Sequence, residues 1–169
     1  MTHDNNVDWE YSASEPIHVG RWATARRLLH DDTLRTEDRL AGLLLILYAQ
    51  WPAAISRLTI GHIDEDNGTV RIRLGDVPVA LPAPLGELAL QQVAVQRSHA
   101  VLARTTSPWL FPGGQPGRPI SIWAIGERLR KLGIRLAETR STALSQLATE
   151  LPSAILARTL GIHITVAVK

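Results

Sequence analysis

The side chains best suited to chemistry lie in the last third of the chain. Arg140 occurs in a segment with helical periodicity, a second such segment ends at Leu160-Gly161, and His163 follows shortly before Lys169. The forked donors of an arginine match the geometry and charge of phosphate oxygens. Arg140 and His163 are therefore candidate residues for a phosphate-handling site.

Positive charge is concentrated in the same part of the chain. Residues 77–169 hold ten basic and four acidic side chains, whereas residues 1–17 hold four acidic side chains and no basic one. Such a distribution is found both on ordinary solvated surfaces and on proteins that bind an anionic partner. The charge pattern alone does not decide between the two.

The composition is that of one globular domain. The chain has 169 residues, of which 45% are apolar, and it contains no cysteine. Disulfides and thiolate metal sites are therefore excluded, and a reducing, cytoplasmic location is the simplest expectation. The longest apolar run, residues 40–49, is about half as long as a membrane span, and the acidic N-terminus is unlike a secretion signal. We expect no membrane contact.

Hydrophobic periodicity predicts a mainly helical domain over residues 18–169, preceded by a flexible acidic tail over residues 1–17. A helix is predicted over residues 18–30. A second begins at Thr36 and continues through residues 40–49, which are apolar on every side. Because a helix that is apolar all round must be buried all round, it should form the core. Further helices are predicted over residues 85–104, 121–133, 139–149 and 152–160.

Three short stretches rich in β-branched residues predict a small antiparallel meander. They are residues 58–63, 69–74 and 77–81, and the turn signals Asn67-Gly68 and Gly75-Asp76 separate them. The predicted fold is therefore α+β, mainly α, with a three-stranded antiparallel sheet.

The order of these elements resembles the catalytic domain of tyrosine recombinases, the phage integrase family, and in particular divergent members found in actinobacteria. The resemblance covers residues 18–169 and depends on the order and spacing of its segments. These are LLLILYAQ followed by ISRLTIGHID, GTVRIRLGDVPVALPAPL, LFPGGQPGRPIS, and IRLAETRSTALSQLATELPSAILARTLGIHI.

The resemblance implies transesterification at a DNA phosphate. In that family a tyrosine hydroxyl attacks phosphorus, a lysine or histidine protonates the departing 5′-oxygen, and two arginines brace the phosphate. Guanidinium donors suit the charge that spreads over the nonbridging oxygens in the transition state. On this pattern Arg140 corresponds to the second arginine, and His163 to a motif histidine displaced by one residue. No cofactor is expected.

Other positions of the pattern have lost the required side chains. The first arginine falls on Ala53 or Ala54, the hairpin lysine on Gly75-Asp76, and the histidine of the His-x-x-Arg pair on Ala137. The nucleophilic tyrosine would follow Lys169, as if the domain were truncated before it. Since loss of one preorganised donor typically costs about 10²–10³ in rate, we expect no autonomous strand cleavage, and Arg140 and His163 are interpreted as catalytic remnants.

The leading hypothesis is a degenerate, recombinase-like DNA-binding domain whose basic side chains contact backbone phosphates. For Arg140 the structural alternative is an ion pair with Glu138 or Glu150, and for His163 a place in a helix cap or in the core. The candidate DNA-binding residues are Arg57, Arg128, Arg130, Lys131, Arg135, Arg140 and Arg158.

Three other hypotheses stay open. An active recombinase could carry its tyrosine on a C-terminal extension or receive it from a partner protomer. Residues 143–169 could form a helix-turn-helix, although the apolar residues after Gly161 are poor readers of base edges. The apolar C-terminal segment could also dock onto another chain, which would make the protein a homo-oligomer or an interaction domain.

Two further motifs could suggest different chemistry. Residues 113–118 are glycine-rich but lack the Lys-Ser/Thr end of a phosphate loop. His62, Asp64 and Asp66 are close in sequence, but they precede an Asn-Gly turn, where acidic residues are ordinary turn formers. We therefore expect a turn-rich connector and no metal site.

Overall fold

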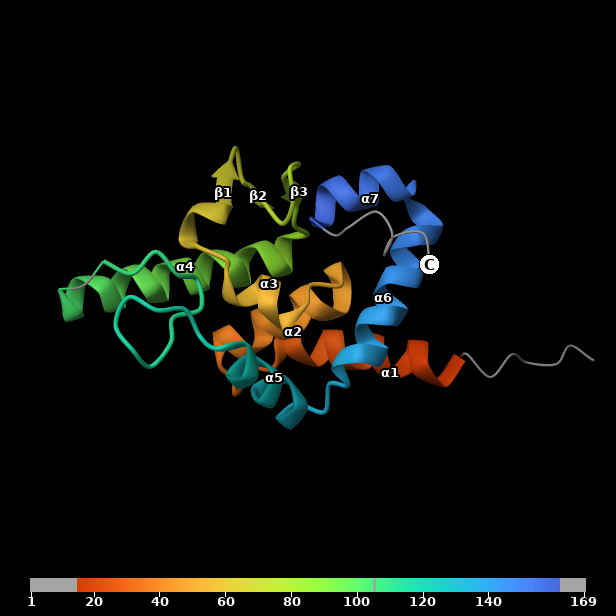
Figure 1. Ribbon diagram of the computed structural model, residues 1–169, viewed down its shortest axis with the longest axis horizontal. Helices are drawn as coiled ribbons and strands as arrows, with labels where there is room; N and C mark the ends of the chain where they lie inside the picture. Colours follow the sequence, from red (N-terminus) through yellow and green to blue (C-terminus); the bar gives the residue numbers. More distant parts are fainter. Residues whose placement is uncertain (1–14, 105, 162–169) are drawn as a thin grey trace, which may run out of the picture.

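The computed structural model describes residues 15–104 and 106–161, which form a mainly helical α+β fold with a three-stranded antiparallel sheet (Figure 1). The predicted fold class is confirmed. The helices are α1 (Glu15–His30), α2 (Thr36–Tyr48), α3 (Pro52–Ser56), the 3₁₀ turn η1 (Ile60–His62), α4 (Ala83–Ala103), α5 (Ile122–Lys131), α6 (Leu136–Glu150) and α7 (Ser153–Leu160). The strands are β1 (Ile63–Asp66), β2 (Thr69–Ile72) and β3 (Val79–Ala80).

Helix α2 forms the centre of the fold, as its apolar sequence predicts. Leu40, Leu43 and Leu44 are completely buried, and the helix packs against α1, α4, α5 and α6. It ends where Ala49 adopts a left-handed conformation with φ of 54°, and Pro52 then begins α3. The chain therefore turns sharply in a short linker, residues 49–51, between the buried helix and α3.

The meander is present, but the prediction of a strand over residues 58–63 was wrong. The Thr59 amide donates to His62 Nδ1 at 3.0 Å, and the Thr59 hydroxyl lies 2.7 Å from the same nitrogen. This local cap stabilises the turn η1, and the first strand begins only at Ile63. Side-chain capping therefore outweighed the β propensity of this stretch.

The hairpin between β1 and β2 follows its turn signal. Asp66 pairs with Thr69 across Asn67 and Gly68, whose φ angles are 50° and 76°. Positive φ at both central residues is typical of the tight hairpin turns that match strand twist. The sequence therefore predicted this turn correctly.

The ends of the chain are only partly described. Helix α1 begins at Glu15, earlier than the predicted start at residue 18, and residues 1–14 of the predicted tail lie outside the described residues. Within residues 15–104 and 106–161, no helix combines the length and apolar character that crossing a bilayer requires. Figure 1 shows α6 running from α5 towards α7, which lies beside the sheet.

Candidate functional site

Arg140 extends from α6 to the linker that follows α2. Its Nε donates a hydrogen bond of 3.1 Å to the carbonyl oxygen of Ala49, the residue that caps α2. Its guanidinium carbon lies 5.5 Å from the centre of the Trp51 ring. The last carbonyls of a helix have no partner within it, and they attract positive charge. Arg140 is thus held in place by the end of α2 and by an aromatic face.

The electrostatic state of Arg140 is that of a half-buried cation. Burial lowers its pKa below the ordinary value for an arginine. An arginine nevertheless stays protonated near neutral pH. Among the described residues it makes no ion pair with Glu138 or Glu150, and Glu138 instead pairs with Arg135 at 3.2 Å. The ion-pair alternative for Arg140 is therefore wrong, and its two Nη groups have no hydrogen-bond partner within the described residues.

The end of α7 docks against the same linker. The side-chain Nε2 of Gln50, which is almost fully buried, donates to the carbonyl of Leu160 at 3.1 Å and to that of Tyr48. Gly161 caps α7 in a left-handed conformation with φ of 65°. A buried amide that bridges two carbonyls fixes the linker relative to α7.

The turn between β2 and β3 contacts α7 from the other side. The Asp76 amide donates to the carbonyl of Arg158 at 2.7 Å, and a side chain at Gly75 would collide with that carbonyl. Arg140 therefore contacts the linker, the linker contacts the end of α7, and the turn between β2 and β3 contacts α7 in its turn. We call this the linker junction and define it as Ala49–Trp51, Gly75–Asp76, Arg140 and Leu160–Gly161.

Two predicted site residues relate differently to this junction. Arg57 is exposed and caps the C-terminal end of α3, which directly follows the linker. Ala53 and Ala54, where the recombinase pattern has its first arginine, occupy the first turn of that helix. His163 lies outside the described residues, so its position relative to Arg140 stays a prediction.

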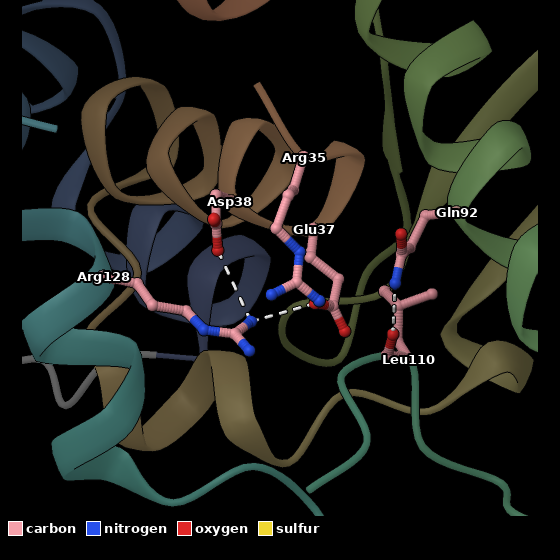
Figure 2. A network of polar contacts seen from close by, with 6 residues as sticks. All are labelled: Arg35, Glu37, Asp38, Gln92, Leu110 and Arg128. Atoms are coloured by element: carbon pink, nitrogen blue, oxygen red, sulfur yellow. Dashed lines mark hydrogen bonds and ion pairs between the residues drawn. The ribbon is translucent and has the colours of Figure 1, made fainter. Parts of the chain in front are cut away.

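Arg128 on α5 is engaged in a separate ion-pair network (Figure 2). Its Nη1 lies 2.9 Å from Glu37 and 3.4 Å from Asp38, in the acidic first turn of α2, and Arg35 reaches Glu37 at 3.2 Å. The side chains of Glu37 and Asp38 are only 12% and 18% exposed. Partly buried carboxylates need a cation, so Arg128 connects α5 to α2.

The remaining basic candidates are more exposed. Arg130 pairs with Glu127 at 2.6 Å and Arg135 with Glu138, each along its own helix. Exposed pairs of this kind contribute little and exchange easily. Lys131 and Arg158 are exposed and form no ion pair with any residue that the structure describes.

Among the described residues, the linker junction contains no side chain placed to act as a nucleophile. Tyr48 is the only tyrosine among the described residues, and it packs against the main core and against a small second cluster formed by Leu156 and Leu160. Burial raises its pKa above the ordinary value of 10.0. A nucleophilic hydroxyl needs the opposite shift or an adjacent base. The junction can therefore bind an anion through Arg140, but its described side chains do not support covalent attack.

Two buried cations, Arg21 on α1 and Arg39 on α2, were not anticipated from the sequence. Arg21 on α1 is almost fully buried, although it occurs in a polar stretch beside Arg26 and Arg27 that looks like a solvated face. His62 acts as the cap of η1, and no group of three or more potential metal ligands lies close together in residues 15–104 and 106–161.

Comparisons of the chain with protein-family models, with curated proteins and with solved structures find no match.

Proposed function

We propose that this chain is a DNA-binding domain related to the tyrosine recombinases, without strand-cleavage activity of its own. The observation that supports the proposal most directly is the environment of Arg140. Its Nε is held by Ala49 and its face by Trp51, while both Nη groups are without a partner among the described residues. A guanidinium fixed in this way is preorganised to bind a phosphate with two parallel hydrogen bonds.

Neighbouring groups extend the proposed phosphate-binding surface. Arg57 lies at the far end of α3, one short helix from the linker, and Arg158 belongs to the helix that Gln50 holds against the linker. Both side chains are exposed. Contacts to backbone phosphates position a protein on DNA without reading its sequence. These three arginines are the proposed backbone contacts, and Lys131, Arg130 and Arg135 contribute at longer range.

The same surroundings argue against cleavage. Alanine occupies the positions of the first arginine and of the motif histidine, and the exposed carboxylate of Asp76 stands where the family pattern has a lysine. An acidic side chain cannot protonate a departing oxygen at neutral pH as an ammonium or imidazolium group does. Loss of several donors that act together removes most of the transition-state stabilisation.

DNA binding is tested by fluorescence anisotropy with a labelled duplex and the full 169-residue chain. We expect binding that weakens as salt rises, with a slope of log K against log[salt] of about −3, since three phosphate contacts release about three counterions. Absence of binding at low salt would sink the proposal. A protected footprint with two half-sites would instead indicate a helix-turn-helix regulator.

A matched pair of variants locates the contact. Arg140→Met should weaken binding and reduce the salt slope by about 1, because one phosphate contact is lost. Arg97→Met removes an equal charge from the exposed surface of α4 and should leave the slope unchanged. Equal effects of the two substitutions would show that only overall charge matters.

Cleavage is tested separately with a nicked duplex that traps covalent protein–DNA intermediates. We expect no covalent complex with this chain. If one formed, the DNA-binding part of the proposal would survive and its cleavage-deficient part would be wrong.

A further inference from the structure

Trp123 differs from the other tryptophans that the structure describes. Trp22 and Trp51 each lie against the guanidinium of an arginine, and the indole Nε1 of Trp109 donates to a carbonyl oxygen. Trp123, the second residue of α5, makes neither kind of contact with a described residue and is 74% exposed. A large ring left in water forgoes the favourable burial that it could have. The Trp123 ring is therefore available for stacking against a partner.

Trp123 lies between two residues that line a groove of about 590 Å³. These neighbours are Ile122 and Ala124, and the groove runs between α3, the start of α5 and the loop over residues 112–121. Ligand sites in proteins commonly have volumes of about 300–1,000 Å³. The groove is therefore large enough to hold a nucleotide beside the Trp123 ring.

The loop that borders the groove is held in one conformation by its own hydrogen bonds. The Gly113 amide donates to the carbonyl oxygen of Arg118 at 2.8 Å, and the indole Nε1 of Trp109 donates to the carbonyl oxygen of Gly117 at 2.9 Å. A ligand that binds to a preformed groove does not have to order the loop, and this lowers the entropic cost of binding.

The charge of the groove favours an anionic ligand. Arg118 and Arg128 line it, and no acidic side chain does so among the described residues. Arg128 is already paired with two carboxylates of α2 (Figure 2), whereas Arg118 is exposed and forms no ion pair with any described residue. Glu127, one helical turn after Trp123, pairs with Arg130 at 2.6 Å. Arg118 is thus the cation that the described part of this surface leaves without a counterion.

We propose that this groove binds single-stranded DNA, with one base stacked on Trp123 and a neighbouring backbone phosphate paired with Arg118. Aromatic stacking beside a cation holds single strands without reading their sequence. In an intact duplex the bases already stack on one another and offer Trp123 no free face. The inference rests on the DNA-binding function proposed above and adds a preference for unpaired DNA. It concerns a separate surface, because the groove contains none of the linker-junction residues.

Fluorescence anisotropy of the full chain compares a labelled oligothymidine strand with a duplex of the same length. Trp123→Ala should weaken binding of the single strand by about tenfold, since one stacking contact is lost, and should leave duplex binding unchanged. Trp123→Phe keeps an aromatic face and should lose much less. Because Trp123 is exposed, neither substitution should alter urea denaturation.

Two further variants separate stacking from general effects of polarity and charge. Leu102→Ala removes an apolar side chain that is 82% exposed at the end of α4, and it should change neither affinity. Arg118→Met should reduce the salt slope for the single strand by about 0.7, because one phosphate contact is lost.

The outcomes distinguish this inference from the proposed function. If the duplex binds and Trp123→Ala leaves the affinity for the single strand unchanged, the inference is wrong and the proposed function stands. Equal losses for Trp123→Ala and Trp123→Phe, or equal losses with single strand and duplex, would also overturn it. Absence of binding to either DNA at low salt would contradict the proposed function itself. If Trp123→Ala instead abolished self-association in sedimentation, with DNA binding intact, Trp123 would belong to an interface between copies of the chain, and the inference would be wrong.

Discussion

Two arginines in the described part of the chain are almost fully buried, Arg39 and Arg21, and their surroundings differ. Arg39 uses all three nitrogens of its fork. Its Nε and Nη2 donate to the carbonyls of Leu28 and Leu29 at 2.7 and 2.6 Å, and its Nη1 pairs with Asp32 at 2.8 Å. Arg21 on α1 leaves two guanidinium nitrogens without a hydrogen-bond partner among the described residues. The first arrangement is a complete structural cap, and the second leaves two buried donors without an acceptor among the described residues.

The same distinction separates two partly exposed arginines. Arg128 is held by two carboxylates of α2, whereas Arg140 is held through Nε alone and keeps its Nη groups available. Neighbouring acidic groups therefore separate Arg128, which joins two helices, from Arg140, whose Nη groups stay available for the proposed binding. Substitution of each arginine tests that division. The largest loss of stability is expected for Arg39, whose hydrogen bonding is the most complete.

Arg39→Met should lower the free energy of unfolding by about 3–4 kcal/mol, because two carbonyls at the end of α1 lose their donors in a buried corner. Urea denaturation of the full chain measures this loss of stability. Arg35→Met, which removes an exposed arginine near the same helix start, should cost less than about 1 kcal/mol. Similar losses in the two variants would contradict the structural role assigned to Arg39.

The substitutions Arg128→Met and Arg140→Met should have opposite effects on stability and on DNA affinity. The first leaves Glu37 and Asp38 with one cation fewer and should cost about 1–2 kcal/mol of stability, with little change in DNA affinity. The second should weaken DNA binding several-fold at low salt and cost less stability. Denaturation and anisotropy on the same protein samples compare them. If Arg128→Met weakened DNA binding as much as Arg140→Met, the proposed division between the two regions would fail.

Arg21→Met should leave stability unchanged or raise it by about 1 kcal/mol, because an unpaired buried charge is replaced by an apolar chain of similar length. The measurement is urea denaturation beside Arg39→Met. A loss comparable to that of Arg39→Met would show that Arg21 has an essential structural partner, contrary to the contrast drawn above.

The smallest expected effect concerns Tyr48, next to the linker. Burial raises its pKa above 10.0 in the folded chain. The unfolded chain therefore releases this proton first as pH rises, and stability falls from about pH 10 until the folded pKa is passed. Below that range the contribution is fully present. Tyr48→Phe should remove this part of the alkaline loss, which denaturation between pH 8 and pH 11 measures, and an unchanged pH profile would contradict it.

Local signals in the sequence predicted much of the fold. The run over residues 40–49 is the buried helix, Ser121 caps α5 by accepting from the Ala124 amide, and Asn67 and Gly68 form the hairpin turn. Each depends on the chemistry of a few neighbouring residues. The prediction over residues 58–63 failed because the cap between Thr59 and His62 is a specific pairing that average strand propensity does not contain.

The candidate site was predictable only in part. The sequence singled out Arg140 by its place in a pattern, but not its bond to Ala49 or its stacking on Trp51, which lie about ninety residues earlier in the chain. Arg128 carried the same prediction of DNA contact as Arg140 and pairs instead with the start of α2. Apart from the place of Arg140 in the family pattern, nothing in the sequence distinguishes these two arginines.

Sequence alone determined the periodicity, the caps and turns, and the concentration of basic residues. The tertiary structure decided which cations are already neutralised and which are not. The reason is physical, since the availability of a guanidinium depends on burial and on acceptors within hydrogen-bond reach, and these come from residues distant in sequence. Arg39 and Arg21 are the same residue type, and they differ in the hydrogen-bond acceptors that the fold places around them.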